Sequence, residues 1–128
     1  MKELSKNVGT MVYDGLVTDL TPAVQVRGGT AKQLSEAAIY NRGTLLGKGN
    51  DNKLVIYNGA EAAEVKPYCI LVEDTPISAE GDTKVTVYTA GCFDPNKITV
   101  APEYHVTEAD YDELRKNGIV FKAASSAV

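Results

Sequence analysis

Short apolar runs separated by turn residues constrain the fold of this chain more than any other feature. Clear examples are Lys53–Tyr57 (KLVIY), Pro67–Asp74 (PYCILVED) and Lys84–Gly91 (KVTVYTAG). Gly, Asn, Asp and Pro gather between such runs, where they favour turns because they tolerate positive φ, fix φ or bond their own backbone. The pattern predicts an α+β domain that is mostly β.

A glycine-rich stretch, Arg42–Gly59 (RGTLLGKGNDNKLVIYNG), raises two alternatives, a phosphate loop and a β-hairpin. A P-loop has four residues between its first glycine and a Gly-Lys-Ser/Thr sequence. Here three residues separate Gly43 from the Gly-Lys pair, and another glycine follows the lysine. Turn residues come next, where a P-loop would start a helix. We therefore predict a hairpin between residues 44–46 and 53–57.

One helix is predicted, over residues 107–118 (TEADYDELRKNG). Thr107 is a natural N-cap, and Asp110 three residues later approximates a capping box. Gly118 is well placed to follow the helix in the left-handed conformation. We expect a final strand at residues 119–122, a connector at residues 30–40 and a loop at residues 75–83.

Side-chain spacing also predicts which faces are buried. Val85, Val87 and Thr89 alternate along one strand and lie on one face of it. Tyr111 and Leu114 lie three residues apart and form the expected buried face of the helix.

Length and charge limit the functions open to this chain. Its 128 residues suit one domain, and a net charge of −4 from 13 basic and 17 acidic residues argues against a nucleic-acid partner. No run approaches the roughly 18 apolar residues of a membrane span. Residues 1–9 lack the apolar stretch of a signal peptide, so we expect no membrane partner and a cytoplasmic location in the cell of synthesis.

No pattern of catalytic or metal-binding residues emerges. His105 is the sole histidine, and Cys69 and Cys92 form no CxxC pair, so a four-ligand zinc site is not expected. No nucleophile signature accompanies the histidine. We predict no enzyme activity, no cofactor and two buried free thiols, with a Cys69–Cys92 disulfide as the less favoured alternative.

Residues 1–30 differ in pattern from the rest of the chain. Their apolar residues come in short clusters without a helical period, interrupted by turn signals at Asp14-Gly15 and Gly28-Gly29. Two interpretations remain open: two ordinary edge strands of the domain, or an extended arm that pairs with a partner.

Taken in order, several segments resemble the lambda-type head decoration proteins of bacteriophages, over about residues 44 to 122. The segments are RGTLLGKG, KLVIYNGAE, CILVEDTPISAEGDTKVTVYTAGCFDPNKI and DELRKNGIVFK. They match the family's apolar strand ending in Glu-Asp, its valine-rich strand, its Gly-x-Phe corner at Gly91–Asp94 and its closing helix and strand.

The resemblance implies a non-enzymatic homotrimer of β-clip, barrel-like domains with one C-terminal helix. It would bind the outside of an expanded phage head and cement neighbouring subunits of the major capsid protein. Residues 1–30 would be an extended capsid-binding arm and residues 31–128 the β-rich decoration domain. The protein would reside in the virion, on the outer capsid surface, after assembly in the host cytoplasm. The candidate capsid-binding residues are Met11, Val12, Tyr13, Leu16, Val17, Leu20, Pro22, Val24 and Val26.

Two other functions remain alternatives. One is a small β-rich domain that binds a ligand or phosphate through Gly43–Asn52. The other is a different structural part of a virion, such as a tail or baseplate adaptor.

Overall fold

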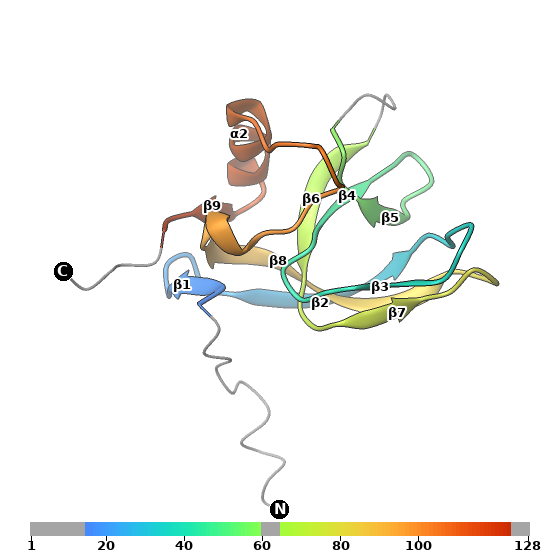
Figure 1. Ribbon diagram of the computed structural model, residues 1–128. Helices are drawn as coiled ribbons and strands as arrows, with labels where there is room; N and C mark the ends of the chain where they lie inside the picture. Colours follow the sequence, from blue (N-terminus) through green and yellow to red (C-terminus); the bar gives the residue numbers. More distant parts are fainter. Residues whose placement is uncertain (1–14, 60–64, 124–128) are drawn as a thin grey trace, which may run out of the picture.

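The computed structural model describes residues 15–59 and 65–123 (Figure 1). Strands dominate this part of the chain, and it contains one α-helix. In chain order the elements are β1 (Val17–Asp19), β2 (Gln25–Ala31), β3 (Ala38–Tyr40), β4 (Leu45–Lys48), β5 (Leu54–Ile56), β6 (Lys66–Leu71), β7 (Thr75–Ile77), β8 (Thr83–Phe93), the 3-10 turn η2 (Pro95–Lys97), α2 (Glu108–Lys116) and β9 (Ile119–Phe121).

Five strands close into a barrel. Their order is β8-β2-β5-β4-β6, and β6 returns to pair with β8. The long strand β8 extends beyond the barrel, where β1 pairs with it on one side and β9 runs parallel to it on the other. Helix α2 packs against β6 and β9. The prediction of a mostly β domain with one C-terminal helix is confirmed.

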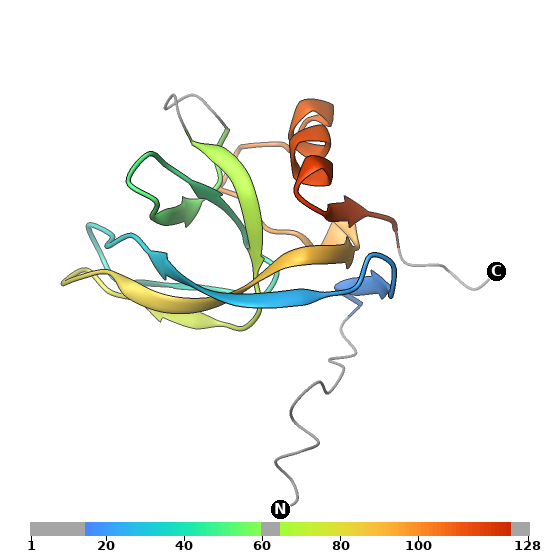
Figure 2. The same ribbon diagram turned by 180° about the vertical axis from the view of Figure 1, so that it is seen from behind.

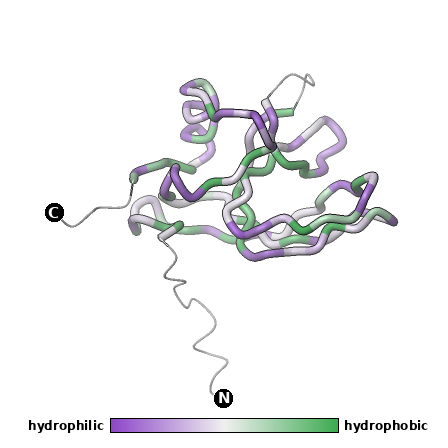
Figure 3. Tube along the Cα trace, viewed as in Figure 1, coloured by the Kyte–Doolittle hydropathy of each residue, from purple (hydrophilic) through white to green (hydrophobic). Residues whose placement is uncertain are grey.

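The predicted hairpin is confirmed as β4 and β5. These strands are antiparallel, with Gly47 opposite Val55, so the Gly-Lys pair belongs to a strand. The turn is closed by the Gly49 N–H, which donates to the Lys53 carbonyl at 3.2 Å. Asn52 takes a positive φ of 65°, which asparagine tolerates better than most residues. In Figure 3 this loop is coloured as hydrophilic, in keeping with its turn composition.

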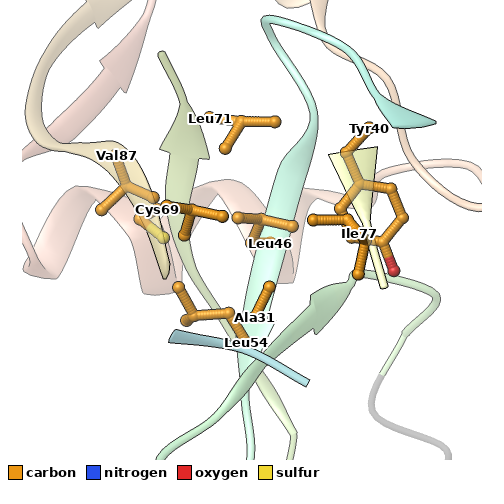
Figure 4. Packing of buried hydrophobic residues seen from close by; sticks show 9 residues of the cluster. Ala31, Tyr40, Leu46, Leu54, Cys69, Leu71, Ile77 and Val87 are labelled. Carbon is orange, nitrogen blue, oxygen red and sulfur yellow. The ribbon is translucent and has the colours of Figure 1, made fainter. Parts of the chain in front are cut away.

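The core of the barrel forms around side chains from all five barrel strands and the β3–β7 ribbon. Figure 4 shows these side chains meeting in the interior. Val85 and Val87 belong to this cluster, as their alternation predicted, whereas Thr89 is half-buried. The buried members are Ala31, Tyr40, Leu46, Leu54, Cys69, Leu71, Ile77, Val85 and Val87.

A second cluster fills the space between the barrel, β1, α2 and β9. Leu114 of the helix is fully buried in it, and Tyr111 is half-buried against Phe121, with ring centroids 5.0 Å apart. Thr107 and Asp110 form the complete capping box. Gly118 takes φ +98°, as expected for the residue that ends this helix.

Two short strands lie in segments expected to be irregular. β3 falls in the connector after Gly28-Gly29, β7 falls in the predicted loop after Asp74, and the two pair antiparallel. Pro76 of β7 pairs with Ile39, in a two-stranded ribbon where both strands are edges. Proline is tolerated at such edges, so its presence did not exclude a strand.

The segment before residue 31 is part of the domain. β1 pairs with the end of β8, and all seven residues of β2 pair with β8 (Figure 2). The chain therefore does not divide at residue 30 as predicted, and for the described residues the alternative of two strands of the domain is correct. Residues 1–14 lie outside the description.

Candidate functional site

The nine predicted capsid-binding residues fall into three groups. Met11, Val12 and Tyr13 lie outside the described residues. Leu16, Val17 and Val24 pack into the second core cluster, and Pro22 is half-buried. The remaining two are exposed, Leu20 by 74% and Val26 by 52%.

Leu16 fixes the start of the described chain to the core. Its side chain is 2% exposed, and its carbonyl accepts a hydrogen bond from the Asp94 N–H at 2.8 Å. Val24 packs in the same cluster, beside Gly91. Burying side chains of this size contributes about 1.5–3 kcal/mol each. These residues therefore stabilise the domain and do not form a free binding surface.

Polar contacts tie β1 to the end of the domain. The Lys122 ammonium lies 3.1 Å from the Asp19 carboxylate, and the Thr18 hydroxyl donates to the Lys122 carbonyl at 2.9 Å. The lysine lowers the pKa of Asp19, first through this hydrogen bond and then through its charge. Both side chains are well exposed, so the pair contributes little to the free energy of folding.

Leu20, Val26 and Ile39 are the large hydrophobic residues that the described chain leaves exposed. Leu20 and Val26 come from the segment implied to contact a capsid, and Ile39 (62% exposed) lies on the β3–β7 ribbon. The first two were among the predicted candidates, but Ile39 was not, because residues 30–40 were interpreted as a connector.

A groove runs beside β2 that the sequence analysis did not identify. It consists of two adjoining hollows of about 200 and 270 Å³ that share Arg27, Tyr68 and Thr89. Gly28, Gly29 and Lys48 line the smaller hollow, and the Lys48 ammonium lies 4.4 Å from the centre of the Tyr68 ring. We call this feature the β2 groove. The paired glycines within a β-rich segment were the one sequence signal that pointed to it.

The hollow beside the β4–β5 loop does not present free cations to phosphate. A hollow of about 360 Å³ beside the β4–β5 loop is lined by Lys32, Asp51 and Lys53, among others. Lys32 lies 3.4 Å from the Asp51 carboxylate, and Lys53 lies 2.8 Å from that of Asp82. Neighbouring acids thus neutralise both lysines, which argues against a phosphate site in this hollow.

A buried carboxylate holds the helix to the barrel. Asp110, 6% exposed, accepts hydrogen bonds from the Tyr57 hydroxyl at 2.7 Å, from the Tyr104 hydroxyl, and from the Thr107 N–H at 3.0 Å. Burial alone would raise the pKa of Asp110, but these hydrogen bonds outweigh it and lower the pKa. Burial, reinforced by the carboxylate, raises the pKa of Tyr57. This network is structural, because the Asp110 carboxylate is buried and the groups that donate hydrogen bonds to it belong to the domain itself.

The remaining candidates for chemistry do not converge. His105 is exposed, and Cys69 and Cys92 are buried free thiols, as predicted. Burial raises the pKa of the Cys69 thiol to about 12, which makes it unreactive at neutral pH. Within residues 15–59 and 65–123, no cluster of three or more metal-ligating side chains forms. In the same residues, α2 is too short and too polar to cross a membrane.

A scan against protein-family models and a search of curated proteins both gave no match to this chain.

Proposed function

We propose that this protein is a capsid decoration protein, a homotrimer of β-clip domains that binds the outer surface of an expanded phage head. There it cements neighbouring subunits of the major capsid protein. The proposal is supported by the order of the motifs that resemble the decoration family. In space these motifs are the β4–β5 hairpin, β6, β8, the Gly91–Asp94 corner and the α2–β9 unit, all within one domain.

One structural observation carries the proposal furthest. Leu20 and Val26 are exposed by 74% and 52%, and among the described residues Ile39 is the only other large apolar side chain left exposed. Exposed apolar side chains on a small domain commonly mark a surface that another molecule covers. Both come from the segment to which the family resemblance assigns capsid contact.

The described strands shorten the proposed arm. Because Leu16 and β1 belong to the core, the arm consists of residues 1–14, which include Met11, Val12 and Tyr13. Three such arms on one trimer act as a multivalent ligand, so that avidity gains about 100-fold or more over a single arm. A ligand that binds only the assembled, expanded lattice stabilises that lattice by linkage.

Deletion of residues 1–14 tests the arm. The truncated protein should keep its cooperative unfolding, because it retains every core residue that the structure describes, and should lose most of its binding to expanded heads that lack the protein. Sedimentation of these heads with bound protein measures occupancy. Full occupancy by the truncated protein would contradict the proposed arm.

Substitution of the exposed apolar residues tests the second contact. We expect the double variant Leu20→Ser, Val26→Ser to bind heads at least about tenfold more weakly, since each burial contributes about 1.5 kcal/mol or more. Ile39→Ser is the matched control, because Ile39 is 62% exposed but lies outside the proposed contact. Equal loss of binding by the control would show that the effect is not specific.

Analytical ultracentrifugation of the purified protein tests the proposed trimer. The measured mass should be three times the 13.7 kDa chain mass.

A further inference from the structure

Strand β2 has one paired edge and one open edge. On one side all seven residues pair with β8. On the other side Ala31 pairs with Leu54 of β5, and no described residue pairs with Gln25–Thr30. Six residues at about 3.3 Å each span roughly 20 Å, the length of an ordinary strand.

This edge lacks the features that usually prevent pairing with another chain. Natural edge strands are protected by proline, by several charged side chains or by bulges. In β2 there is no proline, the one irregularity lies between Gln25 and Val26, and Arg27 is the only charged residue. A Cβ added at Gly28 would meet only one atom, at 4.0 Å, whereas a Cβ added at Gly29 would lie 2.8 Å from Leu54 Cδ1. A strand glycine with open space around it, as at Gly28, leaves room for another backbone to approach closely.

The β2 groove is electropositive, although the protein as a whole is acidic. Its charged residues are Arg27 and Lys48, and no Asp or Glu lines either of its hollows. Among the described residues, the ion pairs are formed by basic side chains other than Arg27 and Lys48. Lys48 instead stacks on Tyr68, a contact that leaves its ammonium available to an anion.

We infer that the β2 groove binds an extended segment of a partner protein that carries an acidic side chain. The segment adds a strand to the open edge of β2 along Gln25–Thr30, approaching most closely at Gly28, and its carboxylate lies between Arg27 and Lys48. Main-chain pairing of this kind gives affinity, and the side-chain contacts give specificity. A second copy of β2 is a poorer occupant, since it would bring another Arg27 into an already cationic groove. The inference does not rest on the proposed function.

Selection from a displayed library of random peptides tests the proposal on the full chain. We expect the recovered peptides to combine β-branched residues with Asp or Glu, and to bind more weakly as salt is raised. Amide hydrogen exchange should slow at residues 25–30 when such a peptide is added, because open-edge amides become paired. Failure to recover any binder, or protection confined to other residues, would overturn the proposal.

Substitutions of the two groove cations test whether the peptide carboxylate binds at this site or is attracted to basic side chains anywhere on the surface. Arg27→Gln and Lys48→Gln should each weaken binding of a selected peptide by about tenfold or more, measured by calorimetry. Lys116→Gln is the matched control, because Lys116 is an exposed lysine of α2 that lines neither hollow. Far-UV circular dichroism verifies that the variants are folded. If the control weakens binding as much as the groove variants, or if neither groove variant does, the assigned site is wrong.

Discussion

Replacement of Asp110 by asparagine tests how the helix is held to the barrel. This carboxylate receives the Tyr57 hydroxyl on one oxygen, and the Tyr104 hydroxyl and Thr107 N–H on the other. Tyr57 is 53 positions away in sequence and follows β5, so the contact joins α2 to the hairpin. Asparagine has almost the same shape, which avoids a cavity and isolates the electrostatic effect.

The expected loss follows from the number of acceptors. Suppose that the introduced amide oxygen occupies the position of the carboxylate oxygen that faces Tyr104 and Thr107. It then still accepts both hydrogen bonds, but as a neutral acceptor. The amide NH₂ then faces the Tyr57 hydroxyl in place of an acceptor. A hydrogen bond to a charged group contributes about 1.5–3 kcal/mol, so we expect Asp110→Asn to lower the free energy of unfolding by about that amount at neutral pH.

The pH dependence has a definite sign. The folded-state pKa of Asp110 is lowered, because its hydrogen bonds outweigh the opposing effect of burial. Its contribution is therefore complete above the unfolded value of about 3.9 and is lost as pH falls through the folded value. Asparagine does not titrate, so the difference in unfolding free energy between the two proteins should shrink below about pH 4.

Urea unfolding followed by circular dichroism and tyrosine fluorescence measures this difference at neutral and acidic pH. Asp112→Asn is the control, since Asp112 pairs with Arg115 on the exposed face of the same helix. The control should change stability by less than about 0.5 kcal/mol. A difference for Asp110→Asn that is as small as the control's, or that stays constant down to acidic pH, would refute this account of the network.

Three further predictions concern stability and reactivity. Gly43→Ala should destabilise by about 2 kcal/mol or more in urea unfolding, because φ is +93° and a Cβ would lie 2.7 Å from a backbone oxygen. Gly81→Ala, with open space around it, should change stability by less than about 1 kcal/mol. Leu114→Ala should lower stability by about 2–5 kcal/mol and Leu20→Ala by less than about 0.5, by the same assay. Cys69 should react with a disulfide reagent only after unfolding, and fast modification of the native protein would contradict its burial.

The helix and the hairpin were predictable because their signals are local. Thr107, Asp110 and Gly118 specify a start and an end within twelve residues. The β4–β5 turn contains its own turn-forming residues and needs no distant partner to be recognised. The alternation of Val85 and Val87 likewise identified a buried face before any neighbour was known.

The N-terminal segment and the groove were not predictable in this way. Whether an apolar strand pairs with its own domain or with another protein depends on the edge it meets, and β2 meets β8 some sixty residues later. The β2 groove depends on Arg27, Lys48 and Tyr68 coming together from three strands. The burial of Asp110 was not predictable either, because it depends on the distant Tyr57.

Electron cryomicroscopy of heads incubated with the purified protein tests the central proposal most directly. Density the size of three copies of this barrel should appear on the outer surface of expanded heads at three-fold positions, in contact with neighbouring subunits of the major capsid protein. Density confined to the tail or baseplate, or bare heads at saturating protein, would contradict it.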